Sequence, residues 1–422
     1  MKKLIALMCF TALLCGCSSS KSSSEESSSE AKDIAPVTEA ASAVSDDEYE
    51  KNAADESWRE VYKEKVLSLK DSPEYKENIY FSVYDINNDG CPEFIVNTKN
   101  DNDMKSQIFQ CEDGKLVNAA EYDTSLWCVN ENGVLLRFGY DEKADENYTD
   151  YISSGNNYNT ILSARNAFKL VDNKEKYTYF IDGEEVDEDE YNSKTGSLGE
   201  GFTKELGFDF ALNDKEINAV FDKNGGYEKA YAAYLSSVQD KGFEEGIAFS
   251  LLDINDDDVP ELFISDGVSP FSSVIMLTYD DGLRAIGKFG SYGRISFDKN
   301  TKVIHTSNKS IGYTSGACIT LTKRNKLQLD LNYMENSGAV ESDGSEDEVF
   351  YKMNGVKISK DDYYNTIDKY TTNEQYSLGR DNDLSDESVK ALEEGKYKTP
   401  ELFDPETVTE PVQSYDYSQL QE

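Results

Sequence analysis

The chain has 422 residues and is strongly acidic, with 82 Asp and Glu residues against 42 Lys and Arg residues and a formal charge of −40. This charge excludes a general nucleic-acid-binding protein, which needs a basic surface, and it argues against docking of the folded surface on anionic lipid. It suits a solvated extracellular protein and favours divalent cations as partners.

The first seventeen residues have the layout of an export signal. Lys2 and Lys3 form a basic start, and the apolar run from Leu4 to Leu14 has the length of a signal core and is too short to span a bilayer. The run ends in Leu14-Cys15-Gly16-Cys17, which resembles the lipobox of bacterial lipoproteins such as those of Firmicutes. The resemblance implies cleavage before Cys17, diacylglycerol on its sulfur, and anchoring at the extracytoplasmic face of the cell membrane. An ordinary secretory signal that happens to contain cysteines is the alternative.

A flexible tether is expected after the anchor. Residues 17–47 are rich in Ser and Glu, and such a segment cannot bury enough apolar surface to offset the entropy of ordering it. No later stretch is long and apolar enough to cross a membrane.

The rest of the chain repeats itself. The run from Ile79 to Ile95 aligns with the run from Ile247 to Phe263, at a spacing of 168 positions. A second pair of similar segments, around Gly183 and Gly355, is spaced by 172 positions. Two matches in the same order and at nearly the same spacing predict tandem copies of one domain.

Each copy is predicted to begin with an amphipathic helix, at 58–69 and at 227–238, because apolar residues recur there at helical spacing. Short β-branched or alternating runs then predict strands, and Ser359 with Asp362 predicts a capped helix near the end of the second copy. The expected fold is α+β, with two tandem copies of a helix packed on a mostly antiparallel, meandering sheet. The predicted strands are Tyr80–Tyr84, Glu93–Thr98, Gln107–Cys111, Val134–Phe138, Phe249–Leu252, Glu261–Ser265, Val274–Tyr279, Val303–Thr306, Cys318–Thr322 and Leu327–Leu331. The predicted divisions are 1–16 as signal peptide, 17–47 as tether, 48–195 as the first repeat domain, 196–225 as a linker or bridge, 226–374 as the second repeat domain, and 375–422 as a polar, largely disordered tail.

Each copy carries an acidic loop with the ligand spacing of a calcium site. Oxygen side chains at positions 1, 3, 5 and 9 of the loop can converge on one hard cation, and the backbone carbonyl at position 7 adds a ligand. The first ligand set is Asp85, Asn87, Asp89, the Cys91 carbonyl and Glu93, and the second is Asp253, Asn255, Asp257, the Val259 carbonyl and Glu261. Position 6 is Gly90 in the first loop and Asp258 in the second. Because glycine adopts positive φ more readily, the second site is expected to be the weaker one.

The two loops resemble the calcium loops of FG-GAP repeats in integrin α-subunits, and similar loops in Firmicutes lipoproteins of unassigned function. The resemblance implies a structural Ca²⁺ ion in each loop. Asx turns that satisfy the backbone without any metal are the alternative interpretation.

Residues typical of catalysis are scarce. His305 is the single histidine, it lies in a predicted strand, and no neighbouring cysteine suggests a dyad. Beyond the signal and Cys17, the chain has four cysteines, Cys91, Cys111, Cys128 and Cys318. They are either buried thiols, or Cys111 forms a disulfide with Cys91 or with Cys128. No nucleophile elbow, zinc-protease motif or phosphate-binding loop occurs. The leading hypothesis is therefore a non-enzymatic, calcium-stabilised surface module that binds an extracellular glycan, peptide or protein. A hydrolase of polysaccharide or cell wall that works with two carboxylates is the alternative.

Overall fold

A computed structural model describes residues 44–403, with gaps at 73–78, 100–103, 125, 127, 142, 172–173, 200, 224, 242–245, 270–271, 291–293, 311–312 and 337–348. Cys17 and almost all of the predicted tether lie outside the described residues, as does the end of the predicted tail after residue 403. None of the helices in the described part of the chain is long and apolar enough to span a membrane.

The described residues form an α+β structure in which every strand pairing is antiparallel, as predicted. The seven α-helices of this part of the chain are α2 (Asp46–Ala53), α3 (Ser57–Lys70), α4 (Glu188–Gly199), α5 (Asp214–Phe221), α6 (Gly226–Asp240), α7 (Lys360–Ile367) and α8 (Asp386–Glu393). The predicted helices correspond to α3 and α6, and the Ser359 side chain caps α7 by accepting a hydrogen bond from the Asp362 N–H at 3.1 Å, as expected.

The strands of the described residues form four sheets. The first sheet has the order β12-β1-β2-β3-β4, with β1 (Ile79–Tyr84), β2 (Glu93–Lys99), β3 (Met104–Glu112), β4 (Lys115–Tyr122) and β12 (Phe210–Ala211). The second sheet has the order β10-β9-β8-β7-β6-β5-β11, with β5 (Cys128–Asn130), β6 (Val134–Asp141), β7 (Glu146–Ser153), β8 (Asn159–Val171), β9 (Lys174–Ile181), β10 (Glu184–Val186) and β11 (Thr203–Glu205). The third sheet has the order β16-β15-β14-β13-β24, with β13 (Ala248–Leu252), β14 (Glu261–Ser265), β15 (Val274–Tyr279), β16 (Leu283–Phe289) and β24 (Asn382–Asp383). The fourth sheet has the order β22-β21-β20-β19-β18-β17-β23-β25, with β17 (Ile295–Asp298), β18 (Val303–Ser310), β19 (Tyr313–Leu321), β20 (Leu327–Asn336), β21 (Phe350–Met353), β22 (Val356–Lys357), β23 (Gln375–Leu378) and β25 (Leu402–Phe403).

The two halves of the chain, α3 to α5 and α6 to α8, place their strands in the same order. The first sheet matches the third and the second matches the fourth, which gains only β25 at its edge. The helix tyrosines also make equivalent hydrogen bonds, from Tyr62 to the Pro92 carbonyl at 2.9 Å and from Tyr231 to the Pro260 carbonyl at 2.8 Å. A residue in one half can therefore be compared with its counterpart in the other.

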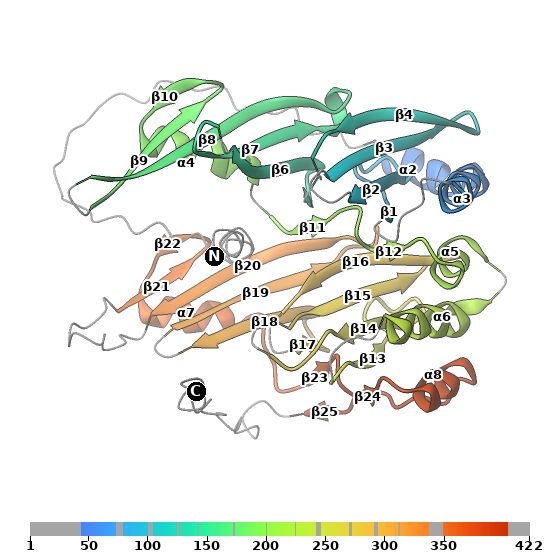
Figure 1. Cartoon of the computed structure of the whole chain (residues 1–422). Coiled ribbons are helices and arrows are strands. Elements are labelled where there is room, and N and C mark those ends of the chain that lie inside the picture. The colour runs from blue at the N-terminus through green and yellow to red at the C-terminus, as the bar shows by residue number, and fades with distance from the viewer. Residues whose placement is uncertain are drawn as a thin grey trace, which may run out of the picture.

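One hydrophobic core joins the two halves. It contains Phe81 and Phe94 of the first sheet, Phe249 of the third sheet, and apolar side chains of α3, α5, α6 and α8. Figure 1 shows these four helices, with α2, at one end of the molecule, while α4 and α7 lie at the other end. Ile95 points to the opposite face of the first sheet, into a second core shared with the second sheet. The third sheet likewise contributes to the shared core on one face and to a core with the fourth sheet on the other, so the first and third sheets are both buried on both faces.

Three features differ from the expectation. Each half has two stacked sheets rather than one meandering sheet, because the first and third sheets are buried on both faces. The predicted linker 196–225 contains β11, β12 and α5, which are built into the sheets and the shared core. Residues 375–403, expected as part of a largely disordered tail, contain β23, β24, α8 and β25, and Leu392 of α8 is fully buried. Such short strands show no alternation of their own, so only their pairing partners define them.

Candidate functional site

The first acidic loop joins β1 to β2 and is folded by its own side chains. The Asp85 carboxylate accepts hydrogen bonds from the N–H groups of Asp89 and Gly90, each at 3.2 Å. The Asn87 side-chain oxygen accepts from the Asp89 N–H at 3.1 Å, and the Asp89 carboxylate accepts from the Cys91 N–H at 2.7 Å. These are Asx turns that satisfy the backbone donors of a tight loop.

The second acidic loop, between β13 and β14, repeats this pattern. The Asp253 carboxylate accepts from the N–H groups of Asp256 at 2.7 Å and Asp258 at 3.0 Å. Asn255 accepts from the Asp257 N–H at 3.2 Å, and Asp257 in turn accepts from the Val259 N–H at 2.8 Å. In both loops the side chain at position 3 also donates to the carboxylate at position 5, from Asn87 to Asp89 at 2.9 Å and from Asn255 to Asp257 at 2.8 Å, while backbone N–H groups of the loop donate to the side chains at positions 1, 3 and 5.

The glutamates at position 9 are buried and tie the loops to the sheets. Glu93 is 1 % exposed, and its carboxylate accepts from the Ile86 N–H at 2.7 Å and the Tyr158 hydroxyl at 2.8 Å. Glu261 accepts from the Ile254 N–H at 3.0 Å and the Thr278 hydroxyl at 3.2 Å. Burial raises the pKa of Glu93 to about 8, with a further contribution from nearby Asp85, and burial raises the pKa of Glu261 to about 7.

The two loops differ in how well they fit a cation. Lys326 precedes β20 in the other half, and its side chain reaches the first loop. Its ammonium group donates to the Asp85 carbonyl and the Asn88 side-chain oxygen, and lies 3.8 Å from the Asp85 carboxylate. A positive charge already stands beside position 1 of the first loop, so this loop does not fit a divalent ion. In the second loop Lys302 pairs with Asp256, which is not one of the predicted ligands. Within the described residues no three His, Cys, Asp or Glu side chains are grouped as a ready metal site.

The choice of residue at position 6 of each loop depends on the neighbouring residues as well as on the backbone conformation. Gly90 has φ +91° and Asp258 has φ +69°, so both residues adopt left-handed backbone. A Cβ at Gly90 would lie 2.5 Å from the Tyr49 carbonyl of α2. The glycine is therefore required where α2 covers the first loop, whereas Asp256, Asp257 and Asp258 of the second loop are exposed.

In the structure a cysteine lies next to the single histidine, a contact that the sequence analysis did not predict. His305 on β18 and Cys318 on β19 are directly opposite, with 3.6 Å between Sγ and Nδ1. The other ring nitrogen lies 2.9 Å from the Tyr370 carbonyl and therefore carries the proton, so the thiol donates to Nδ1. Burial raises the pKa of Cys318 to about 12, which keeps it a thiol and makes this a structural pair. Cys91, Cys111 and Cys128 are also free, so neither possible bridge forms.

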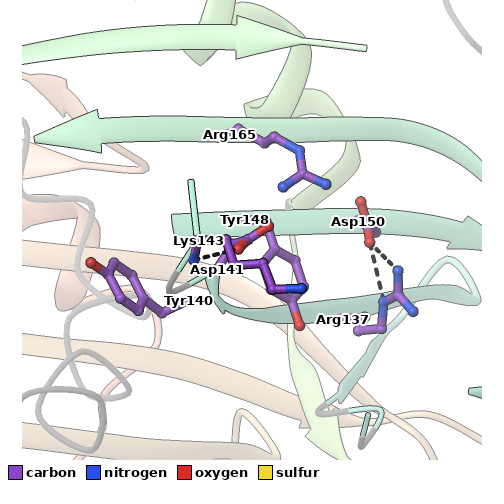
Figure 2. A pocket seen from close by; sticks show the side chains of 7 residues that line it. All are labelled: Arg137, Tyr140, Asp141, Lys143, Tyr148, Asp150 and Arg165. Atoms are coloured by element: carbon purple, nitrogen blue, oxygen red, sulfur yellow. Dashed lines mark hydrogen bonds and ion pairs between the residues drawn. The ribbon is translucent and has the colours of Figure 1, made fainter. Parts of the chain in front are cut away.

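A pocket of about 440 Å³ lies on the second sheet, over β6, β7 and β8 (Figure 2). Figure 2 shows Arg165 above Tyr148, the Arg137–Asp150 pair to one side and Tyr140 to the other. Three side chains in the pocket are cationic, in a chain with twice as many acidic as basic residues. The pocket is lined by Arg137, Tyr140, Asp141, Lys143, Tyr148, Asp150 and Arg165.

The two carboxylates of this pocket are engaged by protein groups. Asp150 is buried, pairs with the Arg137 guanidinium, and accepts from the Ser163 hydroxyl at 2.7 Å. Asp141 accepts from the N–H groups of Lys143 at 2.9 Å and Ala144 at 3.2 Å, and these hydrogen bonds lower its pKa. Both carboxylates are therefore held in place by hydrogen bonds from neighbouring protein groups.

Three charged residues of the pocket, Arg137, Asp150 and Arg165, have uncharged residues at the matching positions of the second half. The bulges after Tyr151 on β7 and after Cys318 on β19 set the register between the halves. Counting from them, the cross-strand pair Tyr148 and Arg165 corresponds to Ser315 and Met334. The pair Arg137 and Asp150 likewise corresponds to Thr306 and Ala317. The same strands form without these groups, so the fold does not require them. This difference between the halves could have identified the pocket residues from the sequence, but matching their positions requires the strand register to be known.

Comparison with known proteins finds no protein family that matches the chain and no curated protein that matches it.

Proposed function

We propose that this chain is a non-enzymatic, lipid-anchored surface protein that binds an extracellular ligand, and that its two halves are copies of one unit. Lipid on Cys17 would hold it at the extracytoplasmic face of the cell membrane, and residues 17–47 would serve as the tether. The observation that carries the binding function is the pocket on β6, β7 and β8, which gathers Arg137, Tyr148 and Arg165 where the matching positions of the second half hold Thr306, Ser315 and Met334. Ligand sites are usually pockets of about 300–1,000 Å³ that combine aromatic walls with a few placed polar groups.

The binding function is tested on cells that produce the full chain. We expect these cells to retain members of a glycan library at their surface. Cys17→Ala removes the acceptor of the lipid, so the protein should be released into the medium and the cells should lose glycan retention. Retention is measured by fluorescence of labelled glycans, and release by immunoblotting of the medium. A folded, surface-held protein that retains no glycan and no extracellular protein would contradict the proposal.

Calcium is proposed for the second loop. The carboxylates of Asp253 and Asp257 face no lysine within ion-pair distance among the described residues, and Asp257 is exposed. Their loop geometry matches the first loop, so the main difference is the absence of an internal ammonium such as Lys326. A bound ion would stabilise the loop and the adjoining ends of β13 and β14.

Thermal unfolding in calcium tests this site. With 1 mM free Ca²⁺ and a dissociation constant of about 0.1 mM, binding to the folded state alone adds about 1.4 kcal/mol to the free energy of unfolding. Asp253→Asn should abolish the calcium-dependent rise in melting temperature, whereas Asp85→Asn should leave it unchanged because Lys326 occupies the first loop. A wild-type chain that melts at the same temperature in calcium and in EDTA would rule out the metal.

A further inference from the structure

We propose that the pocket on β6, β7 and β8 binds the carboxylate of an acidic sugar residue, such as a uronic acid, within an otherwise neutral glycan. This inference rests on the proposed binding function and specifies its ligand. The carboxylate is assigned to Arg165, with Lys143 as the second cation, and the sugar ring to the tyrosine walls.

Arg165 is the cation that is available to a ligand. Arg137 is already neutralised by Asp150, whereas the Arg165 guanidinium makes no hydrogen bond or ion pair with any described residue and interacts with the Asp141 carboxylate only through longer-range electrostatics. Its recorded contact is the Tyr148 ring, 5.7 Å from the centroid. Lys143 is exposed and also lacks an ion pair within the described part of the chain. A planar guanidinium matches a carboxylate with two parallel hydrogen bonds, which gives orientation as well as attraction.

The aromatic wall is positioned by a glycine. Tyr148 lies across the strand from Gly139, and a Cβ at Gly139 would be 2.8 Å from the Tyr148 hydroxyl. The ring can lie over β6 because this position has no side chain, while the second half has Asn308 here, opposite Ser315. Arg137 and Arg165 both lie within 6.0 Å of the Tyr148 ring centroid. The ring, the two guanidinium groups and the glycine therefore form one arrangement on the face of the sheet.

The place of the pocket in the sheet argues for a compact ligand rather than an extended peptide. A peptide that adds to a sheet needs a free strand edge. β7 and β8, which carry Tyr148, Asp150 and Arg165, are paired along both edges, whereas β6 pairs with β5 at Leu135 and Leu136. The groups on β7 and β8 can therefore recognise a ligand only through side chains on the sheet face. Three cations against two acids leave room for one negative charge, and the net charge of −40 repels a polyanion. A single carboxylate on a neutral polar ring satisfies both conditions.

Calorimetric titration tests the assignment. The chain from Ser18 to Glu422, which retains every described residue, is titrated with a neutral glucose oligosaccharide and with the same oligosaccharide carrying one glucuronic acid. We expect the acidic oligosaccharide to bind at least tenfold more tightly, and its binding to weaken as salt is added. Arg165→Met places in β8 the residue that β20 carries at the matching position, and it should reduce the affinity at least tenfold without lowering the melting temperature.

Two control variants separate local from general effects. Lys360→Met removes one exposed charge from α7 in the other half and should leave the affinity unchanged. Arg165→Lys keeps the charge but loses the planar fork, so it should bind with intermediate affinity. Equal affinity of wild type and Arg165→Met, or tighter binding of inorganic phosphate, sulfate or an acidic hexapeptide than of the acidic sugar, would overturn the inference. If the chain binds a glycan but Arg165→Met does not reduce the affinity, the general binding function is supported and the assignment of the ligand to this pocket is wrong.

Discussion

Trp58→Ala is expected to destabilise both halves of the molecule together. Trp58 is 4 % exposed in the core that joins the halves, and the guanidinium groups of Arg59 and Arg284 lie 4.6 and 4.9 Å from its ring centroid. Truncating a buried aromatic residue costs about 3–5 kcal/mol through lost burial and the cavity that remains. The variant also leaves Arg284 without its aromatic partner in a site where burial already lowers its pKa to about 9. Because the core is shared, the loss should lower the stability of the whole structure.

The experiment is urea unfolding followed by circular dichroism, combined with hydrogen exchange of β13 to β16. The midpoint should fall while the transition stays single, and amides of the third sheet should exchange faster although Trp58 lies in the first half. Tyr177→Ala removes an aromatic side chain that is 45 % exposed on β9, outside the shared core, and should change the midpoint only slightly. Two separate transitions, with the third sheet unaffected, would show that the halves are independent.

The helices and the loops could be predicted because their signals are local. The helices at 58–69 and 227–238 keep one face in the core, so their apolar residues recur at helical spacing. The loop side chains contact backbone groups only a few residues away, as with Asp85 and Gly90. Stacking of two sheets in each half was not predictable in this way, since strands buried on both faces, such as β2 and β14, lose the alternation that marks the solvent side.

The contacts that decide how the sites are used come from distant parts of the chain. Lys326 reaches Asp85 from 241 positions away, and this contact makes the first loop unlike the second although their ligand spacing is the same. The pocket lies on β6, β7 and β8, of which β7 and β8 were not among the predicted strands, and Arg137 and Arg165 come together only through the strand register. The sequence predicted two similar halves, whose strands follow the same order in the sheets, and the comparison of matched positions distinguishes residues that the fold requires from residues of the proposed site.

The stability of the wild-type chain is expected to fall as the pH rises from about 5 to 8. Glu93 and Glu261 keep their protons in the folded state up to a pKa of about 8 and about 7, whereas an ordinary glutamate has a pKa of 4.5. Between these values the folded state binds more protons than the unfolded chain, so the free energy of unfolding decreases with pH. Each group contributes about 1.4 kcal/mol per pH unit within its own window, and above pH 7 only Glu93 continues to contribute. The stabilising contribution is fully present below pH 4.5 and lost above pH 8.

The double variant Glu93→Gln, Glu261→Gln should flatten this dependence, because glutamine stays neutral in both states while retaining an oxygen for the Ile86 and Ile254 N–H groups. Urea midpoints measured at half-unit intervals from pH 5 to 8 give the slope, and the double variant should be the more stable protein at pH 8 by a few kcal/mol. Glu60→Gln removes one carboxyl group from the exposed side of α3 and should keep the wild-type slope. Parallel profiles for wild type and the double variant would mean that the two buried carboxyl groups titrate alike in the folded and unfolded chain. In that case both glutamates would be ionised in the folded state, and the hydrogen bonds from the Tyr158 and Thr278 hydroxyl groups would stabilise their carboxylates.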